Sequence, residues 1–131
     1  MQSAQVYSVG SELAKVRVTT SEILDQARFE DCRLVEKQLG ITEVRQSPDS
    51  SKPSDLAIPA ANRALGASGL ERGEIDAIIY CGIERDVLEP ATAHIIAAAL
   101  GMRPAICFDV SNACHGFVSG LHVANAMIRS G

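Results

Sequence analysis

Short apolar segments alternate with amphipathic ones along the second half of this chain, and this alternation sharply narrows the possible folds. Residues 75–81 and 105–110 are apolar runs with the length and composition of buried strands. Helical patterns precede, separate and follow them. Strands that alternate with helices pair in parallel, because the helix carries the chain back to the same edge of the sheet. The sequence therefore predicts an α/β fold with helices layered on a mostly parallel sheet.

Glycine, proline and capping residues indicate where the predicted elements begin and end. Ser54 or Asp55 caps a helix, and Pro90 fits the first position of another helix that stops at Gly101. The other predicted elements are helices at 22–27, 30–39 and 112–129 and short strands at 4–10 and 41–46.

The composition restricts both the core and the function. Of the 131 residues, 47% are hydrophobic, but only 4% are aromatic, so we expect a core of Ala, Ile, Leu and Val. The net charge is −4 and no block of five Lys or Arg residues occurs, which argues against a nucleic-acid partner. The longest apolar run, 95–100, is too short for a membrane span. Residues 1–10 lack the pattern of a signal peptide, so a cytoplasmic protein is expected.

Four cysteines are present: Cys32, Cys81, Cys107 and Cys114. They form no C-x-x-C pair, and no group of His, Cys, Asp and Glu has the spacing of metal ligands, so no metal site is expected. Without an export signal, the thiols should stay reduced. Each is either a small buried hydrophobe or a reactive group, and the two cysteines in predicted strands fit burial.

Cys114 stands between a predicted buried strand and the start of the last helix. A helix N-terminus carries about half a positive charge and unpaired N–H groups, which stabilise a thiolate and an oxyanion. Ala113 and Gly116 flank the thiol with small side chains, so a substrate carbonyl has room to approach. A cysteine at a helix start is also often structural, and this local pattern leaves both interpretations open.

The segment around this cysteine resembles a known family. Residues 108–117, Phe-Asp-Val-Ser-Asn-Ala-Cys-His-Gly-Phe, are similar to the active-site cysteine segment of β-ketoacyl-ACP synthase III, a condensing enzyme of the thiolase superfamily. Residues 76–81 resemble that family's second core strand, and residues 88–93 resemble the start of its next helix. The resemblance implies an incomplete thiolase-like fold. Residues 1–131 would be its N-terminal part, truncated before the last strands of the first half and the whole second half.

The resemblance also implies an activity. Members of the family form an acyl-thioester on the cysteine, here Cys114, and extend it by Claisen condensation, as in fatty acid biosynthesis. Their substrates are thioesters of coenzyme A or acyl carrier protein, and no other cofactor is expected. The catalytic His and Asn come from the second half, so we expect this chain alone to be inactive in condensation. Family dimers pair the strand before the cysteine, which implies a homodimer.

Glu89 has two interpretations. Residues 85–90 resemble the acyl-CoA condensing enzymes of long-chain olefin biosynthesis, in which a glutamate matching Glu89 crosses the dimer interface to the partner's cysteine as the proposed base. An acidic residue just before a helix also offsets the helix dipole. The chain departs from the fatty-acid enzymes elsewhere. Those usually carry Trp and Arg to grip coenzyme A where this chain has Leu34 and Gln38.

Other residues near the cysteine have structural interpretations. Asp109 is expected to cap the turn that follows it or to orient groups beside the thiol. His115 is expected to pack or to line a pocket, and Gly116 and Gly120 to allow close packing of the last helix. Two alternatives to a condensing enzyme remain open: a non-catalytic thiolase-like subunit or acyl-binding partner, and a cysteine thioesterase.

Overall fold

The computed structural model describes most of the chain, namely residues 4–26, 37–103 and 106–131. The chain divides into a larger compact unit, Met1–Glu12 with Lys52–Gly131, and a smaller one, Leu13–Ser51. The predicted helix at 30–39 falls outside the described residues except for residues 37–39, which are helical. Cys32 and Leu34 also lie outside them.

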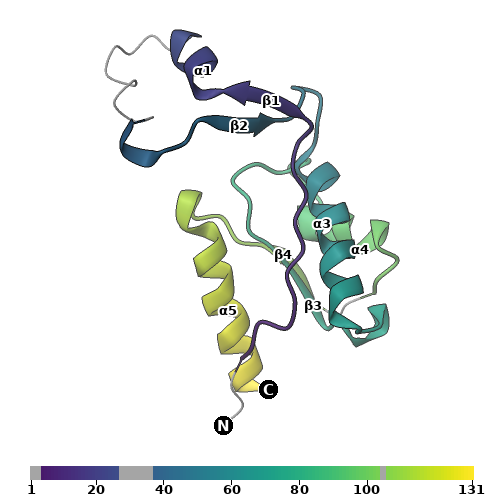
Figure 1. Cartoon of the computed structure of the whole chain (residues 1–131). Coiled ribbons are helices and arrows are strands. Elements are labelled where there is room, and N and C mark those ends of the chain that lie inside the picture. Colours follow the sequence, from purple (N-terminus) through teal and green to yellow (C-terminus); the bar gives the residue numbers. More distant parts are fainter. Residues whose placement is uncertain (1–3, 27–36, 104–105) are drawn as a thin grey trace. The chain divides into compact units, whose positions relative to one another are not determined.

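The smaller unit contains a two-stranded antiparallel sheet (Figure 1), in which β1 (Val16–Thr19) pairs with β2 (Glu43–Gln46). α1 (Thr20–Gln26) follows β1 directly. Thr19 and Glu22 cap α1 reciprocally: the Thr19 backbone N–H donates to the Glu22 carboxylate at 2.8 Å, and the Glu22 N–H donates to the Thr19 hydroxyl at 3.2 Å. The sequence predicts β2 but not β1, although the two valines of β1 alternate with charged residues as in a strand.

The larger unit has helices on both faces of a pair of strands (Figure 1). In chain order its elements are α3 (Pro53–Ser68), η2 (Arg72–Glu74), β3 (Ala77–Tyr80), α4 (Thr92–Ala99), β4 (Ile106–Asp109), η3 (Ala113–His115) and α5 (Gly116–Ser130). β3 and β4 are parallel, which confirms the predicted pairing. α3 and α4 lie on one face of the strands and α5 on the other. Helices layered on a parallel sheet are the α/β architecture that the sequence predicts.

Alternate residues of β3 and its C-terminal extension face different layers. Ile78 and Tyr80 pack against the buried core beside α3 and α4, whereas Ile79 and Cys81 face α5. The buried members of that core are Ile96, Leu100 and Met102. β3 is half-buried rather than buried on both faces as predicted, because α5 leaves part of its face open.

Two glycines let α5 approach β3 closely. A Cβ atom on Gly116 would lie 3.1 Å from the carbonyl oxygen of Cys81, and one on Gly120 would overlap the Cys81 Sγ atom. Both glycines are buried. The predicted packing role of this pair is confirmed.

α4 begins two residues later than the sequence predicts. Pro90 was expected at its first position, but the helix starts at Thr92 with Ala91 as its N-cap. The Asp109 carboxylate accepts hydrogen bonds from the backbone N–H groups of Thr92 and Ala93, both at 2.9 Å. Asp109 therefore caps α4 rather than the turn after β4, which corrects the capping role expected of it.

The predicted opening strand at residues 4–10 is absent, and this segment packs on α3 instead. The Ser8 hydroxyl donates to the carbonyl oxygen of Ala64 at 2.8 Å, and Arg63 forms an ion pair with Glu12. The contact with α3 is made by Ser8 and Gly10, whereas the apolar side chains of Val6, Tyr7 and Val9 are exposed. A strand needs a neighbouring strand with free hydrogen-bonding groups, and none pairs with this segment in the described part of the chain.

Replacing Gly10 by alanine is expected to destabilise the larger unit by about 1–3 kcal/mol, because the new Cβ would overlap the backbone of α3 at Ala60 and Ala64. Gly66→Ala is the matched control. Gly66 lies in α3 with nothing within 4 Å of an added Cβ, so that change should stabilise by about 0.5–1 kcal/mol. Denaturant unfolding followed by circular dichroism measures both changes. An unfolding midpoint for Gly10→Ala equal to wild type would contradict the close approach.

Candidate active site

Cys114 lies in a sharp turn between β4 and α5. The backbone N–H of Val110 donates to the carbonyl oxygen of Tyr80 at 2.8 Å and continues the β3–β4 ladder by one residue. The chain then turns through η3, where Ala113 has a φ of 43°, in the left-handed region that side-chain-bearing residues rarely occupy. The His115 N–H closes the turn on the Asn112 carbonyl oxygen at 2.9 Å. We call residues 110–115 the Cys114 turn.

The Cys114 thiol is exposed, and α5 begins two residues later. The first turn of α5 contains no acidic side chain, so no carboxylate there offsets the positive end of the helix dipole. The Asn112 side-chain amide donates to the Ser119 hydroxyl at 3.0 Å and ties the turn to α5. The thiol is therefore accessible and lies beside a helix N-terminus, as the sequence predicts.

The other described cysteines have different surroundings. Cys81 and Cys107 are half-buried. Burial raises the pKa of the Cys81 thiol above its ordinary value, and the nearby Asp109 carboxylate raises it further. The Cys81 thiol also contacts the carbonyl oxygen of Ile79 at 3.8 Å.

Iodoacetamide is expected to alkylate Cys114 at least about tenfold faster than Cys81 and Cys107 at pH 7.5. Cys114 is exposed, whereas the raised pKa of Cys81 leaves a smaller fraction of that thiol ionised at any pH below it. Peptide mass spectrometry of a time course measures each rate separately. Equal rates at Cys114 and Cys81 would contradict the difference in accessibility.

Glu89 lies in the loop of residues 81–91 between β3 and α4, which we call the Glu89 loop. Its side chain is exposed, its peptide bond to Pro90 is cis, and among the described residues it makes no hydrogen bond or ion pair. The neighbouring Leu88 side chain is 84% exposed. Asp109, not Glu89, bonds the first N–H groups of α4. Glu89 therefore makes no capping hydrogen bond to α4 within the described residues, and its two expected roles, as a base and as an acid near the helix dipole, both stay predictions.

A polar network around the buried side chains of Asp109, Thr92 and Ser54 connects the Glu89 loop to the end of β4. The Asp109 side chain is only 5% exposed and lies 3.8 Å from Nε of Arg85 in the Glu89 loop. The Asp86 backbone N–H donates to the Thr92 hydroxyl at 3.3 Å. The Asp86 carboxylate in turn accepts from the Ser54 backbone N–H at 3.0 Å and from its hydroxyl. Sequence reasoning missed this network, because its partners come from four separate segments.

The remaining candidates take surface positions, and His115, which was expected to pack or to line a pocket, is exposed and does not line the groove described below. The side chains of His94, His115 and His122 are all exposed, and Gln38 is exposed in the smaller unit. No group of three or more His, Cys, Asp or Glu in the described ranges has a geometry that suits a metal ion. Within the same ranges, no helix is long and apolar enough to cross a membrane.

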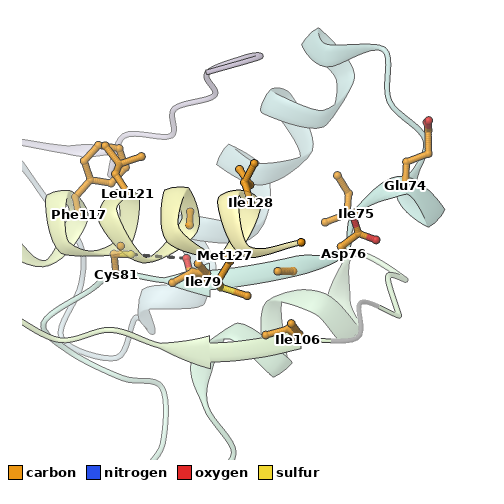
Figure 2. A pocket seen from close by; sticks show the side chains of 14 residues that line it. Glu74, Ile75, Asp76, Ile79, Cys81, Ile106, Phe117, Leu121, Met127 and Ile128 are labelled. Atoms are coloured by element: carbon orange, nitrogen blue, oxygen red, sulfur yellow. Dashed lines mark hydrogen bonds between the residues drawn. The ribbon is translucent and has the colours of Figure 1, made fainter. Parts of the chain in front are cut away.

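An apolar groove runs between α5 and the β3–β4 pair (Figure 2), with a volume of about 880 Å³. Phe117 and Leu121 of α5 lie at the end nearest Cys81, and Met127 and Ile106 line the groove farther along. Cys114 does not line it. The groove and the exposed thiol are therefore separate features of the larger unit.

The sequence of the site matches a known family. A family model described as 3-oxoacyl-[acyl-carrier-protein (ACP)] synthase III matches residues 108–131. The chain is 41% identical over 128 residues to the acyl-CoA:acyl-CoA alkyltransferase of Shewanella oneidensis, covering 92% of this chain and 37% of that protein. It is 38% identical over 132 residues to the β-ketoacyl-[acyl-carrier-protein] synthase III of Neisseria meningitidis serogroup B, covering 100% of this chain and 41% of that protein.

Solved structures are similar as well. The 3-oxoacyl-[acyl-carrier-protein] synthase III of Aquifex aeolicus has a TM-score of 0.83 at 29% identity, over 95% of this chain and 40% of that one. A glutamate-to-glutamine variant of OleA from Xanthomonas campestris has a TM-score of 0.83 at 28% identity, over 99% of this chain and 40% of that one. The chain thus spans about two fifths of the length of the relatives that it matches. In sequence and in fold alike, this chain is β-ketoacyl-ACP synthase III-like and has an incomplete thiolase-like fold.

Proposed function

We propose that the protein containing this chain is an acyltransferase that forms a carbon–carbon bond by Claisen condensation, with Cys114 as its nucleophile. The observation that carries the proposal is the exposed Cys114 thiol, in a sharp turn before α5 and inside the segment that matches the synthase family. We further propose that residues 1–131 are the N-terminal part of a thiolase-like fold. The catalytic His and Asn would come from outside this chain, which alone would not condense.

The first step would load the cysteine. The Cys114 thiolate attacks the carbonyl carbon of an acyl-thioester, a new carbon–sulfur bond forms, and the carrier leaves as its thiolate. Relatives are named for acyl-CoA and for acyl carrier protein, which supports thioesters of these two carriers as substrates. We propose no further cofactor, because an ionised thiol and oxyanion donors suffice for this step.

The second step would use Glu89. A base removes a proton from the α-carbon of a second thioester, and the resulting carbanion attacks the acyl carbon and expels the Cys114 thiolate. Glu89 is exposed and without a polar partner among the described residues, beside the exposed Leu88. An exposed carboxylate of this kind is available to act in the active site of another protein chain. We propose that this chain is a second copy in a homodimer. A cytoplasmic location stays a prediction of the sequence.

The test is incubation of the intact protein with an acyl-CoA, followed by peptide mass spectrometry. The acyl mass is expected on the peptide that contains Cys114. Absence of acylation there, or acylation at another cysteine, would overturn the proposal. Release of free acid without a condensed product would assign a thioesterase instead.

A further inference from the structure

Asp109 directly precedes the Cys114 turn in the chain, and its carboxylate lies beside the Glu89 loop. It is the last residue of β4, so its backbone leads directly into the Cys114 turn. Its carboxylate reaches in the other direction and bonds the first N–H groups of α4, at Thr92 and Ala93. α4 is the helix that the Glu89 loop enters. One side chain therefore connects the end of β4 to the end of the Glu89 loop.

The surroundings of Asp109 make this connection rigid. Both carboxylate oxygens are occupied at 2.9 Å, and the side chain is 5% exposed, so water does not compete effectively for them. Thr92 is fully buried and uses its hydroxyl to accept from the Asp86 backbone N–H at 3.3 Å. Arg85 of the Glu89 loop lies 3.8 Å from the same carboxylate. Two residues of the Glu89 loop are therefore held: Arg85 by the Asp109 carboxylate and Asp86 by the Thr92 hydroxyl.

We infer that Asp109 is a positioning residue, which holds the Cys114 turn and the Glu89 loop in a fixed relation through the N-terminus of α4. The inference rests on the proposed function for the roles of Cys114 and Glu89. Asp109 touches no reacting atom in this arrangement. Its effect on the reaction comes from the orientation of the nucleophile, for which small displacements cost large factors in rate.

Asp109→Asn tests the inference in the intact protein. The amide keeps one acceptor oxygen, but its NH₂ group faces a backbone N–H of α4 and loses that bond. Amide hydrogen exchange is expected to become at least about tenfold faster in peptides from both the Cys114 turn and the Glu89 loop. Asp55→Asn is the matched control, because Asp55 also caps a helix, by accepting from the Lys52 N–H at 2.9 Å. In Asp55→Asn, faster amide hydrogen exchange should be confined to the start of α3.

Acylation kinetics distinguish a positioning role of Asp109 from a purely stabilising one. With an acyl-CoA as donor, Asp109→Asn should lower the maximal rate of Cys114 acylation about tenfold and leave the half-saturating donor concentration unchanged. Asp55→Asn should change neither quantity. If Cys114 of the wild-type protein is never acylated, the proposed function is wrong. If amide hydrogen exchange in the Cys114 turn is unchanged in Asp109→Asn, this inference is wrong. An equal loss of rate in Asp55→Asn, or wild-type acylation by Asp109→Asn, also overturns it.

Thr92→Val covers the case in which Asp109→Asn does not fold. Valine keeps the shape and the backbone N–H that Asp109 bonds, but removes the hydroxyl that accepts from Asp86. Exchange should become faster in the Glu89 loop and stay unchanged in the Cys114 turn. Unchanged exchange in the Glu89 loop would show that Thr92 does not hold it, and would overturn the proposed connection through α4.

Discussion

Cys114→Ala is expected to lower acyl transfer from an acyl-CoA by at least about a thousandfold, because the alanine side chain offers no atom that can form the acyl-thioester. The fold should be unaffected, since the Cys114 side chain is exposed and the flanking turn is held by backbone bonds. Radiolabelled acyl-CoA and peptide mass spectrometry measure the transfer, and thermal unfolding measures the stability. The expected combination is an unchanged unfolding midpoint with no acyl label.

Cys107→Ala is the matched control for this change. Cys107 is half-buried in β4, so its replacement should cost about 1 kcal/mol of stability while acyl transfer continues. Acylation of Cys114→Ala at the wild-type rate would show that another residue accepts the acyl group. The proposed role of the Cys114 turn would then be wrong, whatever the fold similarity.

Glu89→Gln is expected to reduce formation of the condensed product by about a hundredfold or more and to leave acylation of Cys114 intact. Glutamine has nearly the shape of glutamate but cannot accept the α-carbon proton, and general bases contribute about 10²–10⁴ in rate. The acyl-enzyme should therefore accumulate. Intact-protein mass spectrometry measures the acyl-enzyme, and chromatography of the extracted products measures condensation. Glu89 is exposed and has no polar partner in the described ranges, so the stability should not change.

Glu84→Gln controls for charge in the same loop. Glu84 is exposed, and among the described residues only its backbone carbonyl takes part in a hydrogen bond, accepting from the Tyr80 hydroxyl at 2.9 Å. This variant should condense at the wild-type rate. If Glu89→Gln also condensed at that rate, Glu89 would not be the base, and the resemblance to the olefin-forming enzymes would not extend to this residue.

Local sequence patterns were sufficient to predict much of the fold of the larger unit. The apolar runs that became β3 and β4, and the glycines that end α3 and α4, each act within a few residues of the chain. Gly69 and Gly101 both adopt positive φ angles where the sequence predicts helix ends. The position of Cys114 between a strand and a helix is local in the same sense. The sequence predicts no strand at β1, although its alternating valines give the same kind of local signal.

The sequence by itself determined the α/β class, the parallel pairing of β3 with β4, and the place of Cys114 between β4 and α5, because periodicity, caps and turns depend on neighbouring residues. Only the tertiary structure decided that Asp109 caps α4, that α4 starts at Thr92, and that residues 4–10 pack on a helix. The physical reason is distance along the chain. Asp109 and Thr92 are 17 residues apart, and Ser8 and Ala64 are 56 apart, so no local preference of either partner specifies the bond.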